Sequence, residues 1–183
     1  MMRWNSFGRS VGFAALAAAG AAVWLLGSSP LLGGRGALAL YLVGVTAIYT
    51  AGLTPSLRRA LATAMLVGTS GAGLAVMAPG LRELAIGLAV VLGVSRSGFL
   101  YRTTAARAVV TEGALIVGGL LFAYSLSGPS LRAIVLCVWS FFLVQSLFFL
   151  VPGARHRTQD ATRGDAFAAA HARALALLER GFV

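Results

Sequence analysis

Several residue types are scarce in this 183-residue sequence: lysine is absent, cysteine occurs once, and only five residues are acidic. The single cysteine, Cys137, excludes an intrachain disulfide and any cluster of cysteine metal ligands. Charged residues make up 11% of the chain, whereas a soluble domain typically carries about 25%. With 58% hydrophobic residues, the chain cannot cover a soluble surface with polar groups, so we expect lipid to be its main solvent.

The residue types that membrane enzymes use are missing from the apolar parts of the chain. Both histidines, His156 and His171, fall in the polar C-terminal part, where they cannot ligate a haem or a metal inside a membrane span. Only one acidic residue, Glu112, falls in an apolar segment, whereas an intramembrane aspartyl protease needs two. No glycine-rich phosphate loop with its lysine is present. We therefore expect a protein that is not an enzyme and that holds no cofactor and no metal.

Six apolar segments of near-membrane length follow one another along residues 1–151. A helix needs about 20 apolar residues to cross a bilayer, and its backbone groups must bond within the helix. The connectors, such as SSPLLGGRG and SGPSLR, contain turn residues and are short, so neighbouring helices must be antiparallel. The fold class predicted is therefore all-α: a polytopic integral membrane protein with six transmembrane helices in a bundle. The predicted spans are Val11–Gly27, Ala37–Leu53, Ala60–Ala78, Leu84–Tyr101, Ala108–Leu126 and Ala133–Val151.

The arginines divide unequally between the two ends of these spans. One side holds only Arg35, Arg82 and Arg132, and all the others belong to the opposite side. Because arginine-rich loops stay in the cytoplasm, we expect a multi-pass protein of a bacterial inner membrane with both termini cytoplasmic. The first segment, which resembles a signal peptide, is expected to stay as the first helix. The formal charge of +10 then reflects topology and contact with anionic lipids, and nucleic acid is not an expected partner.

The C-terminal part of the chain changes character after the last apolar segment. Residues 152–164 read as a polar linker, and residues 165–183 read as a cytoplasmic amphipathic helix that begins at the N-cap Asp165. Its alanine-rich apolar stripe buries too little area for a good membrane anchor, so we expect it to dock on protein. The expected partner-docking residues are Phe167, Ala174, Leu175 and Leu178.

The segment LGVSRSGFLYRTTAARAVVTEGAL (92–115) places charges next to apolar spans. In a hairpin that turns near Thr104, Arg96 and Glu112 reach about the same depth, roughly 8 Å inside the interface at about 1.5 Å per residue. An isolated charge in hydrocarbon costs about 2.5 kcal/mol or more, so we predict an intramembrane ion pair between Arg96 and Glu112. Ser95, Ser97 and Thr111 are candidates for the remaining hydrogen bonds.

Three interpretations of this charged segment stay open. The pair is a structural clasp, or its members lie among the headgroups, or Arg96 joins Arg102 and Arg107 in a site for an anionic lipid headgroup or a small anion. Gln145, in the middle of the last span, is expected to make a polar contact with a neighbouring helix.

Two further patterns bear on helix packing. Gly71 and Ala75 form a small-xxx-small pair that allows close approach of helices, and the phenylalanine-rich sixth span looks like a helix that faces lipid or a bulky partner. The segments AIYTAGLTPSLRRAL (47–61) and FAYSLSGPSLRAIVL (122–136) resemble each other and would relate two inverted halves. The alternative is that two turns use the same turn residues.

These observations favour a non-catalytic accessory or scaffold subunit of a bacterial inner-membrane complex, with other membrane-protein subunits as partners. The competing interpretations are a small six-helix transporter built as a three-plus-three inverted repeat, or a membrane protein that binds anionic lipid or a small anion.

Overall fold

The computed structural model describes most of the predicted membrane domain. The described residues are 6–54, 56–100 and 105–150, without the side chains of 98–100 and 105–108. The predicted linker 152–164 and the predicted C-terminal helix 165–183, with its docking residues Phe167, Ala174, Leu175 and Leu178, lie outside these residues.

The described residues are helical almost throughout and contain no strand, which confirms the all-α prediction for this part of the chain. The described residues form five α-helices, together with a π-helical turn and a 3₁₀ turn after the fifth helix. They are α1 (Phe7–Gly52), α2 (Leu57–Met77), α3 (Leu81–Val94), the π-helix η1 (Ser95–Leu100), α4 (Ala105–Ser125), α5 (Leu131–Ser146) and the 3₁₀-helix η2 (Leu147–Leu150).

The predicted count of six helices is not what the described residues show, because the first two predicted spans belong to one helix. The connector SSPLLGGRG continues α1, which runs for 46 residues, and only Gly33 leaves the helical conformation inside it, with φ 70° and ψ 155°. A positive φ is open to glycine at little cost, since glycine has no Cβ to clash. The serine, proline and glycine residues of this connector, which would predict a loop in a soluble protein, therefore form helix on both sides of Gly33.

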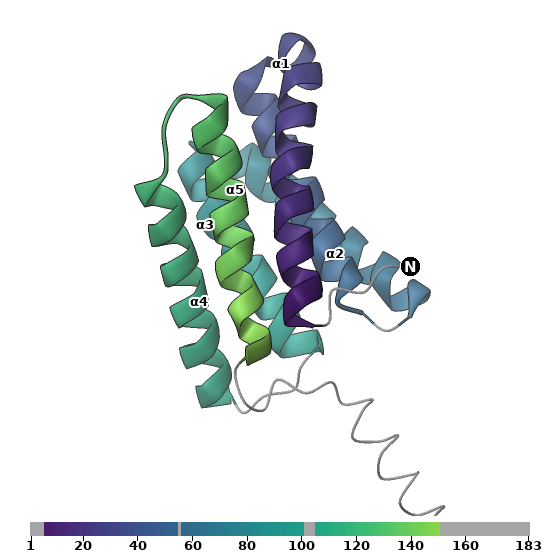
Figure 1. Cartoon of the computed structure of the whole chain (residues 1–183). Coiled ribbons are helices and arrows are strands. Elements are labelled where there is room, and N and C mark those ends of the chain that lie inside the picture. The colour runs from purple at the N-terminus through teal and green to yellow at the C-terminus, as the bar shows by residue number, and fades with distance from the viewer. Residues whose placement is uncertain (1–5, 55, 101–104, 151–183) are drawn as a thin grey trace, which may run out of the picture.

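The two arms of α1 fold back on each other at this break (Figure 1). Trp24 Nε1 donates to the Ala37 carbonyl oxygen at 2.9 Å, and the Tyr41 hydroxyl donates to the Ala17 carbonyl oxygen. Both bonds join the first arm to the second, so the arms are packed antiparallel neighbours.

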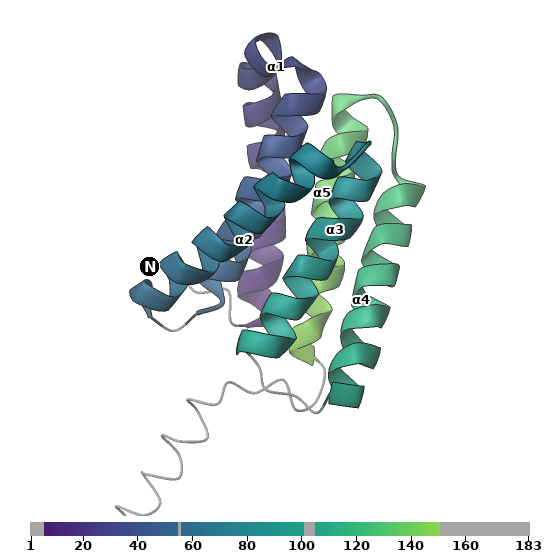
Figure 2. The same cartoon turned by 180° about the vertical axis from the view of Figure 1, so that it is seen from behind.

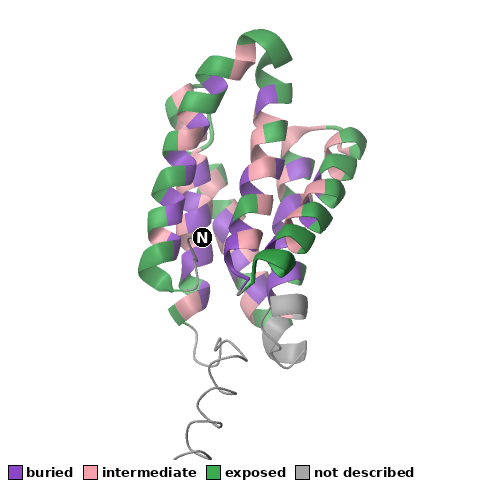
Figure 3. Ribbon diagram, turned by 90° about the vertical axis from the view of Figure 1, so that its right-hand side faces the viewer, coloured by how far each residue is buried: buried purple, intermediate pink, exposed green. Residues whose placement is uncertain are grey.

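Three helices are long and apolar enough to cross a membrane within the described part of the chain: Phe7–Gly52, Leu57–Met77 and Leu131–Leu150. Val109–Ser125 is a shorter apolar helix. Large apolar side chains are exposed on the outer faces, among them Val76 at 88% and Val110 at 72%, while buried residues gather where helices face each other (Figure 3). This combination is consistent with a helical membrane protein, whose outer side chains meet lipid instead of water.

The helices form a bundle in which successive helix ends alternate between two ends of the molecule (Figures 1 and 2). The start of α1, the α1–α2 connection, η1 and η2 lie at one end, which we call the network end. The Gly33 break and the connections α2–α3 and α4–α5 lie at the other end. At this far end, the Arg35 guanidinium donates to the Pro79 carbonyl oxygen at 2.8 Å and so holds the α2–α3 turn against α1.

Helix α5 lies between α1 and α4 and buries one face against them, while its Leu136 stays 45% exposed (Figure 1). Its Val138 and Phe142 are buried in one cluster with Ala14, Ala17 and Ala21 of α1. The alanine methyl groups leave room for the bulky α5 side chains, so the phenylalanine-rich helix packs closely on α1.

The small residues of α2 mark a close approach between helices, as their spacing predicts. A Cβ added at Gly71 would lie 2.9 Å from Val43 Cγ1 and 3.0 Å from Leu88 Cδ2. Any larger residue at this position would push α1 or α3 away, because nearly all real Cβ contacts are longer.

Candidate functional site

The most polar part of the bundle interior is centred on Arg96, which is 0% exposed. Arg96 lies in the π-helix η1, directly after α3 ends at Val94. A π-helical turn is rare and often found at functional sites. The sequence predicts an α-helical span through Tyr101 and gives no indication of this wider turn.

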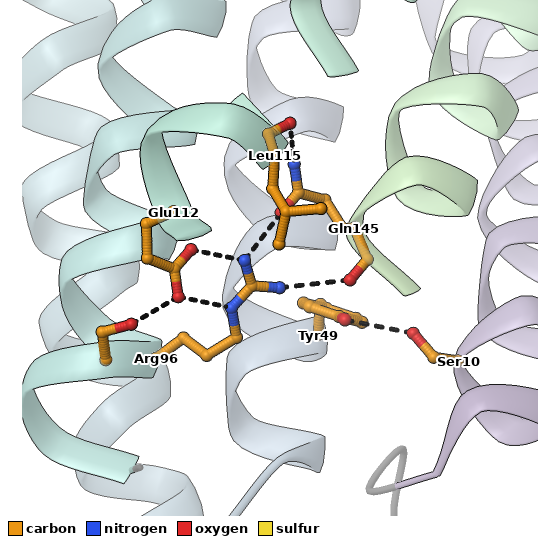
Figure 4. A network of polar contacts seen from close by, with 7 residues as sticks. Ser10, Tyr49, Arg96, Glu112, Leu115 and Gln145 are labelled. Carbon is orange, nitrogen blue, oxygen red and sulfur yellow. Dashed lines mark hydrogen bonds and ion pairs between the residues drawn. The ribbon is translucent and has the colours of Figure 1, made fainter. Parts of the chain in front are cut away.

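The Arg96 guanidinium holds the Glu112 carboxylate with two hydrogen bonds (Figure 4). Arg96 Nε donates to Glu112 Oε1 at 2.9 Å, and Arg96 Nη2 donates to Glu112 Oε2. The Ser97 hydroxyl also donates to Glu112 Oε1. The structure thus brings together the two charged residues that the depth argument pairs, and it assigns Ser97 to the carboxylate. A bidentate pair of this kind is among the stronger protein hydrogen-bond arrangements.

Gln145 of α5 completes the surroundings of the guanidinium. Arg96 Nη2 donates to Gln145 Oε1 at 3.0 Å, and Arg96 Nη1 donates to the Gln145 backbone carbonyl oxygen at 3.2 Å. The Gln145 amide Nε2 in turn donates to the Leu115 carbonyl oxygen on α4 at 3.1 Å. The predicted helix–helix contact of Gln145 is therefore present, but its link to Arg96 is not part of the sequence prediction.

A glycine on α4 makes room for this amide. A Cβ at Gly119 would lie 3.2 Å from Gln145 Nε2, so glycine lets α5 approach closely enough for the bond to Leu115. Gly93 on α3 acts in the same way toward α4, since a Cβ there would lie 3.4 Å from Glu112 Oε2 and 3.0 Å from Ile116 Cδ1.

Two aromatic residues complete the site, and the sequence analysis did not identify either. The Arg96 Cζ atom lies 4.2 Å from the centroid of the Phe148 ring, within cation–π range. Tyr49 lies beside the guanidinium and interacts with it electrostatically (Figure 4). The Tyr49 hydroxyl also shares a hydrogen bond of 3.1 Å with Ser10 on the first arm of α1. We call Ser10, Tyr49, Arg96, Ser97, Glu112, Gln145 and Phe148 the Arg96 network.

The polar members of the Arg96 network all lie near the network end of their helices, a property that can be read from the sequence. Each polar member lies within about two helical turns of the network end, although the members come from α1, η1, α4 and α5. Sorting polar side chains by distance from the same end of every predicted span would have gathered Ser10, Tyr49 and Gln145 around the charged pair.

The polar groups of the Arg96 network satisfy one another's hydrogen-bonding capacity. Four of the five N–H groups of an arginine side chain are used in the bonds to Glu112 and Gln145. The charges of Arg96 and Glu112 offset each other, so no net charge is buried. Within the described residues, no group of three or more His, Cys, Asp or Glu side chains could hold a metal. The arrangement can therefore tie four elements together without a ligand.

The predicted anion site is described only in part. Arg102 lies outside the described residues, and so does the Arg107 side chain, although the backbone of residue 107 belongs to α4. Arg96 itself is engaged by Glu112 and Gln145.

The two similar segments have the same local role. Ser56 caps α2 by accepting from the Arg59 amide at 3.4 Å, and Ser130 caps α5 by accepting from the Ala133 amide at 3.2 Å. Their aligned tyrosines differ, because Tyr49 is buried and Tyr124 is 66% exposed. This favours shared turn chemistry over two equivalent halves.

In comparisons with known proteins, no family model, curated protein or solved structure matches the chain. The function must therefore be argued from the geometry of the site and from the surface of the bundle.

Proposed function

We propose that this chain is a non-catalytic accessory or scaffold subunit of a bacterial inner-membrane complex. One observation carries the proposal: the charged pair of the described bundle is satisfied internally, by Glu112 and Gln145 around Arg96. A substrate site would be expected to keep hydrogen-bonding groups available for its ligand, whereas a clasp uses them within the protein. Because the clasp joins α1, η1, α4 and α5, it supports a rigid body that presents outer faces to partners.

Those outer faces support association within the membrane. Exposed apolar side chains line α1, α2 and α4, for example Leu16 at 60%, Met65 at 70% and Val117 at 56%. Membrane helices associate through van der Waals packing and close approach, which needs only such apolar and small residues. The arginine distribution of the sequence supports a multi-pass orientation with both termini in the cytoplasm.

The test is to weigh the native assembly. The full chain would be purified in mild detergent through a tag on its C-terminus and analysed by native mass spectrometry. The accessory role predicts foreign membrane subunits in fixed stoichiometry, and the same subunits should be lost from a Glu112→Leu variant that loosens the bundle. Recovery of a stable monomer or homo-oligomer alone would contradict the proposal.

A small transporter is the second candidate, because an ionisable pair inside an apolar bundle is by default a functional site. Its carriers would be Arg96 and Glu112, held at a π-helical turn. Under this reading, Glu112→Gln should leave the folded protein intact and abolish flux in reconstituted vesicles. Glu83→Gln is the matched control, since it makes the same chemical change at an exposed position in the first turn of α3. If Glu112→Gln lowers stability and no flux is measured for the wild type, the transporter reading fails.

A third candidate is binding of an anionic lipid headgroup or a small anion by Arg102 and Arg107 together with Arg96. The charge of these residues supports it, and the bond network of Arg96 disfavours that residue as the contact. Anionic lipid that survives purification of the wild type and is lost from an Arg102→Gln/Arg107→Gln variant would support this role. Equal lipid retention by both proteins would exclude it.

A further inference from the structure

Three exposed arginines at the network end have side chains that the described bundle does not use. Arg9 lies in the first turn of α1, and Arg58 and Arg59 lie in the first turn of α2. Their guanidinium groups form no hydrogen bond or ion pair with another described residue. At the far end, by contrast, Arg35 donates to a carbonyl oxygen of the α2–α3 turn, and Arg82 lies over the ring of an α4 tyrosine. The arginines of the network end are therefore available to an anion from outside the bundle.

Exposed apolar side chains continue from two of these arginines along the same helix faces. On the first arm of α1, Leu16 follows Arg9 by seven residues. On α2, Leu61 and Met65 follow Arg58 by three and seven residues. Such spacings place residues on one face of a helix. Leu16 is 60% exposed, Leu61 57% and Met65 70%, so each face carries a cation at the network end and apolar side chains beyond it.

The face of the first arm borders an exposed part of the second arm of α1. A Cβ added at Gly20, one turn after Leu16, would lie 3.2 Å from the Tyr41 hydroxyl oxygen of the second arm. Ile48 follows Tyr41 by seven residues and so shares its face, and it is 61% exposed. The face that carries Leu16 therefore adjoins Ile48.

The face of α2 adjoins Ile48 as well. The second arm and α2 touch where a Cβ at Gly71 would lie 2.9 Å from Val43 Cγ1. At about 100° per residue, Ile48 is turned about 140° from Val43, and Leu61 is turned about 80° from Gly71 in the same sense. Because the two helices are antiparallel, turns in the same sense lead to the same side of their contact. We call this surface the α1–α2 face, and it consists of Arg9, Leu16, Ile48, Arg58, Leu61 and Met65.

Two glycines keep the α1–α2 face open. A Cβ added at Gly44, one turn before Ile48, meets nothing within 4 Å. The same holds at Gly68, three residues after Met65. There is therefore space for an acyl chain beside the exposed side chains of the face.

We propose that the α1–α2 face binds an anionic phospholipid. Arg9 and Arg58 attract its phosphate group, and an acyl chain packs along the apolar side chains and over the two glycines. The acidic residues among the described ones, Glu83 and Glu112, lie in the first turn of α3 at the far end and in the Arg96 network. Neither of them neutralises the arginines of this face.

A phospholipid matches the α1–α2 face better than an acidic protein segment does. An acidic segment would pair with the arginines but would leave the apolar side chains beside them uncovered, whereas a phospholipid occupies both. The proposed site uses neither Arg102 nor Arg107, and it does not depend on an accessory role of the chain.

The test measures binding of phosphatidylglycerol to the full chain in detergent micelles, with bound lipid counted by native mass spectrometry and phosphatidylcholine as the neutral lipid. We expect Arg9→Gln and Arg58→Gln each to weaken phosphatidylglycerol binding by about fivefold, while phosphatidylcholine binding stays unchanged. Arg132→Gln is the matched control, because Arg132 is exposed and follows the serine cap of α5 by two residues, as Arg58 follows the cap of α2. It lies at the far end and should bind phosphatidylglycerol as the wild type does.

A second pair of variants tests the acyl-chain part of the site. Gly68→Leu fills the open space on the α1–α2 face and should weaken phosphatidylglycerol binding several-fold. Gly73→Leu is its control on another face of α2, where a Cβ also meets nothing within 4 Å, and it should retain the lipid. Both variants should keep the circular dichroism of the wild type.

The proposal is overturned if Arg132→Gln weakens binding as much as Arg58→Gln, since surface charge alone would then explain the lipid. Wild-type binding by Gly68→Leu would overturn it too. So would wild-type lipid binding by Arg9→Gln and Arg58→Gln together with loss of a protein subunit from the native assembly, which would assign the face to an acidic protein segment.

Discussion

Replacing Arg96 and Glu112 with leucine, singly and together, tests whether the ion pair is a structural clasp. Removing one partner of a buried pair leaves the other charge without compensation and typically costs about 3–5 kcal/mol. We expect Glu112→Leu to fall in this range, because Arg96 would keep only its two bonds to Gln145. Arg96→Leu should be similar, since Glu112 would keep only the bond from Ser97.

The double replacement should cost less than the two single replacements added together. It removes both charges at once, and replacing a whole buried pair by apolar residues is often near neutral. The remaining cost comes from the Ser97 hydroxyl and the Gln145 amide oxygen, which lose charged partners at about 1–3 kcal/mol for each buried group left unsatisfied. We therefore expect the double variant to be destabilised by about 2–6 kcal/mol, well below the sum of the two single effects, with a coupling energy of several kcal/mol.

The assay is reversible unfolding in mixed micelles, followed by circular dichroism, with the free energy of unfolding extracted for all four proteins. Glu83→Leu serves as the control because Glu83 is an exposed acid without an ion pair among the described residues. Single effects that simply add in the double variant would refute the clasp, since additivity means that the two side chains do not interact in the folded state.

Three smaller predictions use the same unfolding measurement. Gly71→Val should destabilise by about 1–3 kcal/mol, because a Cβ there already lies 2.9 Å from a neighbouring side chain, whereas Gly73→Ala should be neutral or stabilising because nothing lies within 4 Å. Equal effects of the two would contradict the close approach of α2. Ser130→Ala should cost about 1 kcal/mol through loss of the α5 N-cap, and Ser130→Asp should retain the stability. Tyr49→Phe should cost about 1 kcal/mol through loss of the bond to Ser10, and an unchanged stability would show that this bond contributes nothing.

The sequence predicts helix positions well, because apolar composition changes sharply at the connectors. The predicted third span, Ala60–Ala78, and the observed α2, Leu57–Met77, differ by only a few residues. The Arg96–Glu112 contact is also predictable, since it needs only the depth of each residue on neighbouring helices of a hairpin. Depth follows from counting residues along a helix.

Other features of the site cannot be obtained by counting residues along each helix. The contact between Arg96 and Gln145 requires knowing how each helix is rotated about its axis and that α5 packs between α1 and α4. The continuation of α1 through Pro30 is not predictable from residue types, because proline and glycine are typical of loops. In this connector the helix tolerates proline, and Ser28 bonds back to the Trp24 carbonyl oxygen at 2.7 Å. The π-helical turn at Ser95 has no composition signal at all.

The packing of α5 on α1 also determines the order in which the folded bundle can be completed. The arms of α1 meet through bonds between residues close in sequence, such as Trp24 and Ala37, and such local contacts form early in folding. The ring contact between Phe13 and Phe142, with centroids 5.2 Å apart, instead joins the first of the described α-helices to the last of them. Until α5 emerges from the ribosome, the α1 surface that it covers has no permanent neighbour. A chaperone or insertase that shields α1 during synthesis would therefore occupy the same surface that α5 later takes.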